Sequence, residues 1–346
     1  MGLFQRQKTA NGKTQVPVWF MRQAGRYHEH YQNIKKNSDF MTMCKNPELA
    51  CEITMGPIQD FKFDAAILFS DLLFPLEQLG MGLSYISGPP TLKYHIKNHE
   101  DFKQLKLVDK AENFYAFQNK ALTLLKKTLP AQTDLLGFVG APFTLYAYAV
   151  EGGHSGNLVS SKKGLYDGRF QAFMEILLPQ LLANMDIQAK ANPTAVCLFD
   201  TAAGELALSD YQQFIVPVLR QVCETFKKQH PHTKIIYYSK FTHLHFLEIL
   251  DNPFIDVLGV DWRMDLSQAL KTFSKNYYIQ GNIDPAWLHL PWAQLEKNLA
   301  GFFKTLEKNN VNFEKWICGL GHGVLIETPQ DNVRKTVEFI HKNFIY

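Results

Sequence analysis

Eight short runs of apolar, β-branched or aromatic residues constrain the fold of this 346-residue chain more than any other feature. Most of these runs are apolar at consecutive positions instead of alternating with polar residues. Consecutive apolar positions are typical of strands buried on both faces, as in a parallel sheet covered by helices. The runs are VWFM (18–21), AAILFSD (65–71), LLGFVGAP (135–142), TAVCLFD (194–200), KIIYYSK (234–240), DVLGVDW (256–262), NYYIQGN (276–282) and KWICGLGH (315–322).

Amphipathic stretches with helical spacing separate these runs. Between 170 and 185 apolar residues recur at helical spacing, and the stretch ends before Asn192-Pro193. Eight buried strands that alternate with helices predict an α/β protein, a single (β/α)8 TIM-type barrel. The spacing is uneven, so we expect extra N-terminal and loop helices, notably between 71 and 135.

We expect one domain over 1–346, with a flexible N-terminus at 1–15. An open, doubly wound sheet is the structural alternative. No G-x-G-x-x-G motif follows an early strand, so dinucleotide binding has weak support.

The composition argues against several kinds of partner and compartment. Thirty-six Lys and Arg against 33 Asp and Glu give a net charge of +3, too weak to indicate nucleic acid or a membrane surface. The five cysteines are scattered without a C-x-x-C pair, which argues against disulfides and structural zinc and fits a reducing cytoplasm. The first residues lack the apolar core of a signal peptide, and the uncharged stretch 135–150 is too short and broken to span a bilayer.

Polar residues stand at the ends of the predicted strands, where a barrel builds its active face. Each has an ordinary explanation when taken alone: Asp71 as a helix cap, Tyr148 as core, Thr201 as a turn cap and Lys240 as a solvated charge. The set is harder to dismiss, because the fold brings these ends together. It comprises Arg22, Asp71, Pro142-Phe143-Thr144, Asp200-Thr201, Ser239-Lys240, Asp261, Asn282 and His322.

Two arginines and a histidine favour an anionic ligand at this face. Arg22 and Arg26 flank Ala24-Gly25 at the tip of an apolar run, either as solvated charges or as a pair that converges on an anion. His322 lies between two glycines, which allow a tight turn or the close approach of a ligand. The chain contains no G-x-S-x-G elbow, no Walker loop and no H-E-x-x-H, so the pattern indicates an anionic small molecule without naming a reaction.

Several motifs resemble those of the uroporphyrinogen decarboxylase family. PVWFMRQAGRYHEHY (17–31) resembles its first signature and GFVGAPFTLYAYAVEGG (137–153) its second. KNPELACEITMGPIQDFKFDAAILFSDLL (45–73), FDTAAG, LGVDW, QGNIDP and GLGHG follow in the family's order. The resemblance covers nearly the whole chain.

The resemblance implies a (β/α)8 homodimer that removes the four acetate carboxyls of uroporphyrinogen III, giving coproporphyrinogen III without metal or organic cofactor. Arg22 and Arg26 would bind substrate carboxylates, and Asp71 would accept hydrogen bonds from the pyrrole N–H groups. Tyr148 and His322 would complete the catalytic set. The remaining expected substrate-binding residues are Gln23, Phe69, Phe199 and Thr201. The proton donor stays open, because an arginine is a poor acid.

The sequence departs from the family pattern in three places. Thr201 stands where Ser is common, Pro75 comes one position early after FSD, and Phe241-Thr242 replaces a glycine-rich step. Two other functions share the fold. A zinc-dependent cobalamin-linked methyltransferase would need soft ligands such as His-x-Cys, which this chain lacks. A non-catalytic tetrapyrrole binder is disfavoured because the expected catalytic residues are present.

Overall fold

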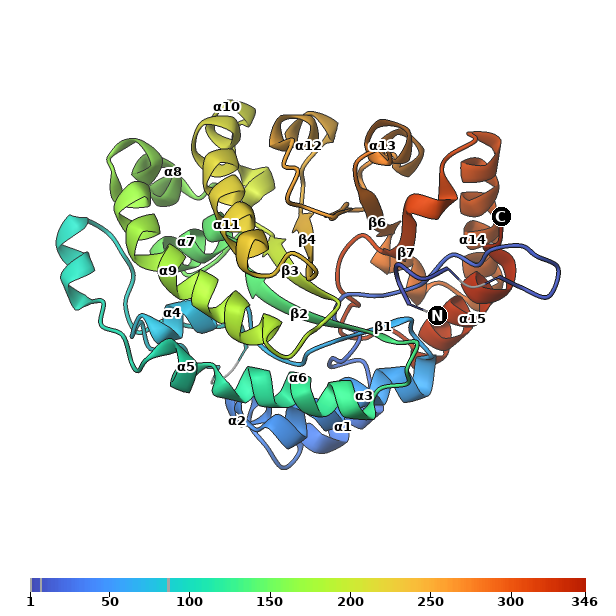
Figure 1. Ribbon diagram of the computed structural model, residues 1–346, viewed down its shortest axis with the longest axis horizontal. Coiled ribbons are helices and arrows are strands. Elements are labelled where there is room, and N and C mark those ends of the chain that lie inside the picture. The colour runs from blue at the N-terminus through green and yellow to red at the C-terminus, as the bar shows by residue number, and fades with distance from the viewer. Residues whose placement is uncertain (1, 7, 86–87) are drawn as a thin grey trace.

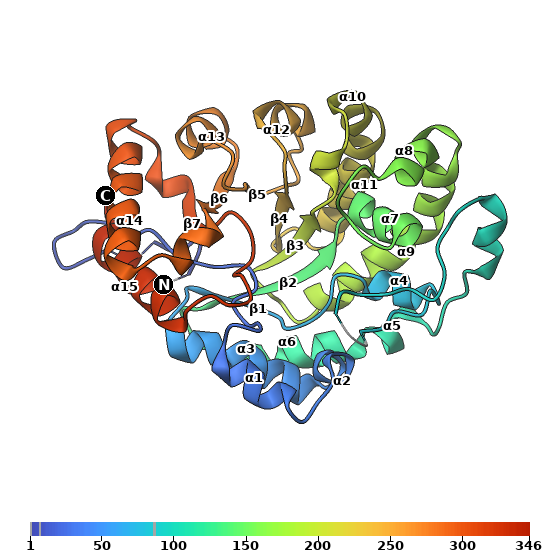
Figure 2. The ribbon, with the colours of Figure 1, turned by 180° about the vertical axis from the view of Figure 1, so that it is seen from behind.

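A computed structural model describes residues 2–6, 8–85 and 88–346. Seven parallel strands form one sheet in the order β1 to β7, so each strand pairs with its neighbour in sequence. The sheet curves into a half-barrel with helices on its outer side (Figures 1 and 2). The strands are β1 (Ala65–Ile67), β2 (Asp134–Gly140), β3 (Ala195–Asp200), β4 (Lys234–Ser239), β5 (Val257–Gly259), β6 (Tyr278–Ile283) and β7 (Trp316–Leu320).

Seven of the eight predicted runs are therefore strands, and the first run, 18–21, is not. That run makes a single parallel bridge, between Val18 and Cys318. Trp19 N–H donates to the Cys318 carbonyl at 3.0 Å, and Asp64 N–H donates to the Val18 carbonyl at 3.0 Å. The segment thus lies between β7 and the residue that precedes β1.

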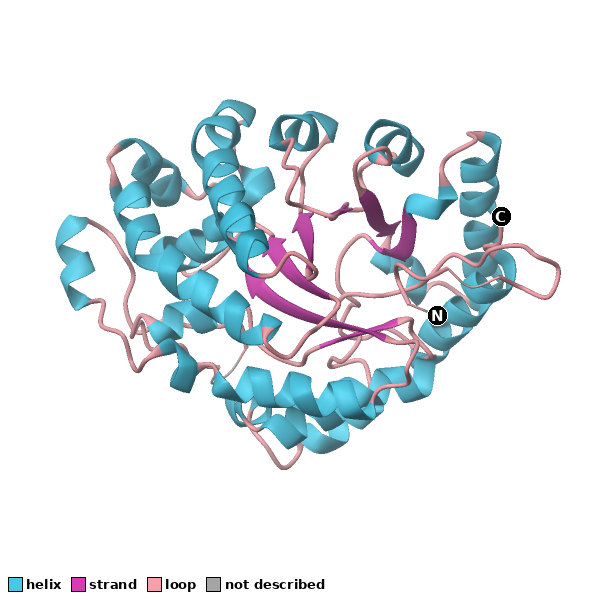
Figure 3. Ribbon diagram, in the orientation of Figure 1, coloured by secondary structure: helices cyan, strands magenta, loops and turns pink. Residues whose placement is uncertain are grey.

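Helices connect the strands and cover the outer face of the sheet (Figure 3). Three helices precede β1 and four helical segments separate β1 from β2, as the uneven spacing predicted. The α-helices are α1 (Glu29–Lys35), α2 (Phe40–Lys45), α3 (Pro47–Phe61), α4 (Phe74–Gln78), α5 (Ala111–Phe114), α6 (Ala116–Thr128), α7 (Pro142–Glu151), α8 (Val159–Tyr166), α9 (Arg169–Ala189), α10 (Leu208–Asp210), α11 (Val216–Gln229), α12 (Leu244–Leu250), α13 (Leu266–Phe273), α14 (Trp292–Lys308) and α15 (Gln330–Asn343). Short 3₁₀ or π segments are η1 (His99–Gln104), η2 (Ala203–Glu205), η3 (Tyr211–Ile215), η4 (Pro285–His289) and η5 (Phe313–Lys315).

The strands bury both faces, as their consecutive apolar residues predicted. In β3, Ala195 and Cys197 belong to a cluster inside the curved sheet, whereas Val196 and Leu198 pack in the larger cluster that includes the helices. Alternate residues of a strand point to opposite faces, so one strand serves both cores.

The described part of 1–15, which we expected to be flexible, makes contacts with the body of the protein. Leu3 is fully buried, and its N–H donates to Asp134 Oδ2 at 2.6 Å. Thr14 and Tyr346 exchange two backbone hydrogen bonds of 3.0 Å, which join the two ends of the chain. In the ranges that the structure describes, no helix combines the length and apolar character needed to cross a membrane.

Candidate active site

The carboxyl ends of the strands bring most of the predicted residues to one edge of the sheet. Asp71 follows β1, Thr201 follows β3 directly, and His322 follows β7. Tyr148 lies in α7, which starts just after β2, and Arg22 ends the bridged run 18–21. Parallel strands end at the same edge, so this common placement follows from the topology.

Asp71 is a half-buried carboxylate with two internal donors. Its Oδ1 accepts the Leu73 N–H at 2.7 Å, and its Oδ2 accepts a hydrogen bond from the Tyr85 hydroxyl. Burial raises the pKa of Asp71 to about 6, and the two hydrogen bonds oppose this rise. The carboxylate is therefore charged at neutral pH. Sequence reasoning missed Tyr85, because no motif marks a loop tyrosine 14 residues away.

Tyr148 is paired with a histidine that the sequence did not single out. Its hydroxyl lies 2.6 Å from His154 Nδ1. Burial lowers the pKa of His154 to about 4, with Lys240 and Arg22 adding to the effect, so the imidazole is neutral at pH 7. A neutral imidazole that carries its proton on Nε2 accepts the Tyr148 hydroxyl at Nδ1. Burial also raises the pKa of Tyr148 to about 12, which keeps the phenol protonated.

Arg22 and His322 meet at the other side of the same edge. Arg22 is exposed and has a left-handed backbone with φ of 55°. A Cβ on Gly323 would overlap Arg22 Cδ, so this glycine makes room for the arginine. Burial, followed by Arg22, lowers the pKa of His322 to about 3. Its buried Nδ1 has no hydrogen-bond partner among the described residues.

Aromatic side chains form the floor between these groups. Phe199 packs against Phe138 at 5.5 Å and Tyr238 at 6.2 Å between ring centroids. Tyr238 in turn stacks on His322 with the rings 14° from parallel. Phe69 belongs to a separate cluster and contacts the rings of Tyr31 and Phe40.

Two residues of the first signature do not join this group. Gln23 is fully buried, and its Oε1 accepts from Trp19 Nε1 and from the Ile67 N–H, both at 3.1 Å. Its Nε2 donates to the Ala65 carbonyl at 3.2 Å, so Gln23 joins the run 18–21 to β1. Arg26 is exposed on the turn before α1 and does not contribute to the shifted pKa values of Tyr148, His154 or His322.

Other strand-end candidates serve internal contacts instead. Asp200 points away from the edge and accepts from Thr144 Oγ1 at 2.8 Å and from the Tyr237 hydroxyl at 2.9 Å. Burial raises the pKa of Asp200 to about 6. Asn282 Nδ2 donates to the carbonyls of Asp261 and Met264 at 2.9 and 2.7 Å. Thr201 is 9% exposed beside the floor.

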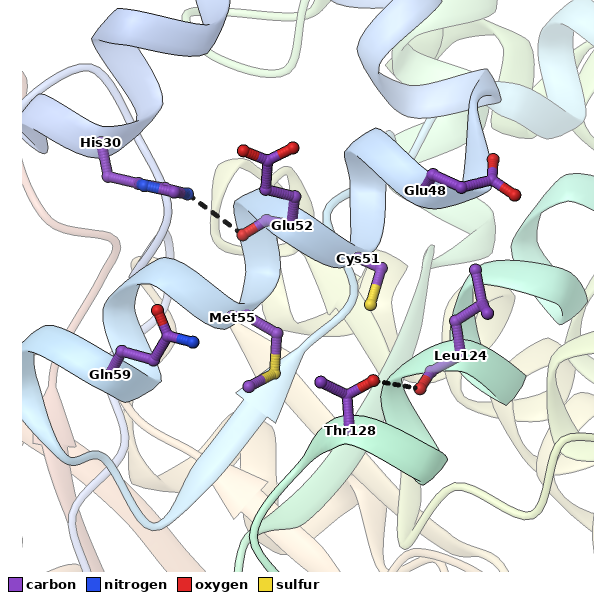
Figure 4. A pocket seen from close by; sticks show the side chains of 8 residues that line it. All are labelled: His30, Glu48, Cys51, Glu52, Met55, Gln59, Leu124 and Thr128. Carbon is purple, nitrogen blue, oxygen red and sulfur yellow. Dashed lines mark hydrogen bonds between the residues drawn. The ribbon is translucent and has the colours of Figure 1, made fainter.

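A surface groove between α3 and α6 is unrelated to this site (Figure 4). It measures about 370 Å³, and His30 Nε2 lies 3.2 Å from the Glu52 carbonyl at its rim. None of the predicted site residues lines it. Across 2–6, 8–85 and 88–346, no three His, Cys, Asp or Glu side chains come together in a way that could hold a metal ion.

The fold is a parallel α/β half-barrel, and the polar and charged residues gathered at this edge make it the candidate active site. The chain belongs to the uroporphyrinogen decarboxylase family: the family model described as Uroporphyrinogen decarboxylase (URO-D) matches residues 4–343. The resemblance seen in the motifs is thereby confirmed.

Relatives support this membership over most of the chain. The chain is 37% identical over 333 residues to the uroporphyrinogen decarboxylase of Roseiflexus sp. (strain RS-1), covering 94% of both chains. It is 35% identical over 332 residues to that of Chloroherpeton thalassium, covering 94% of this chain and 92% of the relative. A solved methyltransferase from Methanosarcina mazei aligns with a TM-score of 0.73, over 95% of this chain and 94% of its own. At 13% identity, that likeness concerns the fold alone.

Proposed function

We propose that this protein is a carboxy-lyase that removes the four acetate carboxyls of uroporphyrinogen III to give coproporphyrinogen III. The observation that carries the proposal is the ionised Asp71 beside Tyr148, with the cationic Arg22 and the neutral His322 at the same edge of the sheet, in a chain of this family. The likeness to a solved methyltransferase does not favour a zinc-dependent methyltransferase, because it is a likeness of fold alone.

The reaction is a replacement of carboxylate by a proton at each acetate. Protonation of a pyrrole ring carbon creates a cation, and the electron pair of the C–CO₂ bond then flows into that ring as CO₂ leaves. The exocyclic methylene takes a proton to become methyl, and the ring carbon gives its proton back. Each of the four decarboxylations therefore consumes one proton and releases one CO₂.

Asp71 is placed to stabilise the cationic pyrrole. A carboxylate fixed by the Tyr85 hydroxyl and the Leu73 N–H retains free lone pairs, which can accept pyrrole N–H groups. In a partly dry cleft such a fixed charge stabilises the developing positive charge without reorganising.

The other expected contacts surround this centre. Arg22 would bind a side-chain carboxylate by a two-pronged hydrogen bond, and exposed Arg26 would hold another from the rim. Phe199 and Phe69 would face the macrocycle, and Thr201 and His322 would contact its side chains. No metal or organic cofactor enters these steps.

We extend the proposal to the whole molecule. The bridge between Val18 and Cys318 supports a (β/α)8-type barrel that the run 18–21 closes between β7 and β1. The full match to the family supports one catalytic domain over 1–346. By the same resemblance we expect a homodimer in the cytoplasm.

The test is product analysis under anaerobic conditions. Purified protein is incubated with enzymatically generated uroporphyrinogen, the mixture is oxidised, and the porphyrins are separated by carboxyl number. We expect successive loss of carboxyls, ending at coproporphyrin. Unchanged uroporphyrin beside a competent control enzyme would refute the proposal, and binding without loss would favour the non-catalytic binder. Stoichiometric zinc in the purified protein would instead favour the zinc-dependent methyltransferase as its function.

A further inference from the structure

Two further cations, Lys240 and Arg263, lie together at the ends of β4 and β5, and both contribute, with Arg22, to the lowered pKa of His322. Lys240 directly follows β4, and Arg263 comes four residues after the end of β5. These strands pair in parallel, so the loops that leave them run side by side (Figure 2). Both cations lie against the ring of Phe241: Lys240 Nζ is 4.3 Å and Arg263 Cζ is 4.1 Å from its centroid.

Phe241 is held in an unusual conformation to make this contact. Its φ of 62° lies in the left-handed region, which is rare for a bulky side chain. Its N–H donates to Asp261 Oδ2 at 2.8 Å, and Asp261 is 1% exposed. A strained backbone that is held by a buried carboxylate is more common at ligand sites than elsewhere.

The same buried carboxylate fixes Arg263. Asp261 Oδ1 accepts the Arg263 N–H at 2.9 Å, and Oδ2 accepts from Nη1 at 3.0 Å. The Arg263 side chain is 48% exposed, so the rest of its guanidinium can reach a ligand. Asp261 thus orients the arginine while its own oxygens are occupied.

Lys240 lacks a comparable partner. Within the described part of the chain it makes no ion pair, although burial, Arg263 and Arg22 all lower its pKa. Asp261 and Glu205 oppose this effect more weakly. A half-buried ammonium group that faces two arginines is favoured only when an anion joins it.

We propose that Lys240 and Arg263 form a second carboxylate site of the cleft, with Phe241 as the platform that aligns them. This inference rests on the proposed function. The site stands three and four strands along the sheet from β1, and it binds a side-chain carboxylate of the macrocycle while Asp71 accepts the pyrrole N–H groups. It acts on substrate binding and orientation, not on bond cleavage.

The test separates binding from chemistry. Lys240→Gln removes the charge and keeps the length, whereas Lys240→Arg keeps the charge. Lys335→Gln is the matched control, because Lys335 also lies against an aromatic ring, 5.7 Å from Trp292, on distant α15. KM and kcat are measured with uroporphyrinogen, and the Kd of uroporphyrin, its oxidised octacarboxylate, is measured by fluorescence quenching at two salt concentrations.

We expect Lys240→Gln to raise KM and Kd about tenfold, as one lost charge-assisted hydrogen bond would. The kcat should change less than about threefold, the salt dependence of binding should weaken, and Lys240→Arg should restore most of the affinity. If the kinetic and binding constants of Lys240→Gln equal those of Lys335→Gln, the proposed carboxylate site is refuted. A wild-type protein that binds uroporphyrin through Lys240 but releases no CO₂ would leave this site standing and refute the proposed function.

Discussion

Asp71 should make the folded protein less stable at neutral pH than it would be with an uncharged side chain. Its folded-state pKa is raised from 3.8 to about 6, mainly by burial. A raised carboxyl pKa means that folding favours the protonated form. The stability that the protonated group contributes is present below the unfolded pKa and is lost as pH rises through about 6. Asp71→Asn removes this dependence while keeping the size of the side chain.

The size of the effect follows from the two pKa values. The gap between 3.8 and about 6 corresponds to roughly 3 kcal/mol at pH 8. Because part of Asp71 meets solvent, we expect a gain in unfolding free energy of about 1–3 kcal/mol in the variant. For 346 residues the unfolding entropy is roughly 0.7 kcal/mol/K, so the midpoint should rise by about 1–4 °C.

The assay is thermal unfolding of wild type and variant at pH 4.5 and pH 8, alongside turnover at pH 8. We expect the full stability gain at pH 8 and about a third of it at pH 4.5, where the unfolded carboxyl is already mostly ionised, together with a sharp fall in kcat at pH 8. Asp331→Asn is the control, since that side chain is 73% exposed. A variant that is less stable at pH 8, or equally shifted at both pH values, would refute the desolvation argument. Near-normal turnover would remove Asp71 from its catalytic role.

Three further variants test the surrounding contacts. Tyr85→Phe removes a hydrogen bond to the charged Asp71, so the acid limb of the kcat/KM–pH profile should move up by about one pH unit. An unmoved limb would show that the Tyr85 hydroxyl does not influence the pKa of Asp71. Gly323→Ala should displace the Arg22 side chain and raise KM several-fold in steady-state assays, with an unchanged circular dichroism spectrum. An unchanged KM would show that Arg22 can bind substrate in another side-chain conformation. His154→Ala leaves a phenol without its acceptor and should lower kcat about tenfold with a smaller change in KM; equal loss in both constants would point to binding instead.

The sequence predicted the sheet well because buried parallel strands carry their own signal. Seven apolar runs are strands, in sequence order. The predicted strand at 18–21 does not form, for two local reasons. Pro17 has no N–H to donate to a neighbouring strand. The chain then turns away from the sheet at Arg22, whose φ is 55°. A four-residue run with a turn at its end leaves room for only one bridge.

The site was harder to predict. The end of a predicted strand shows which residues lie at the edge of the sheet, but not to which face each side chain points. Phe199 and Asp200 are neighbours in β3, yet Phe199 faces the floor and Asp200 bonds to Thr144 behind the sheet. The alternation of the strand could have indicated this, since Cys197 and Phe199 share a face. No sequence pattern could have found Tyr85 or His154, since each reaches the site from a long loop.

The charges of the cleft also argue for a particular kind of ligand. A simple polyanion would gain from Arg22 and Lys240 but would be repelled by Asp71, which is ionised above a pKa of about 6. The two kinds of group have no ion pair with one another in the described part of the chain, so each keeps its charge for something else. A ligand that offers N–H donors at its centre and carboxylates at its periphery satisfies both at once. A reduced tetrapyrrole has that distribution, whereas a linear polycarboxylate lacks the central donors and should bind far more weakly.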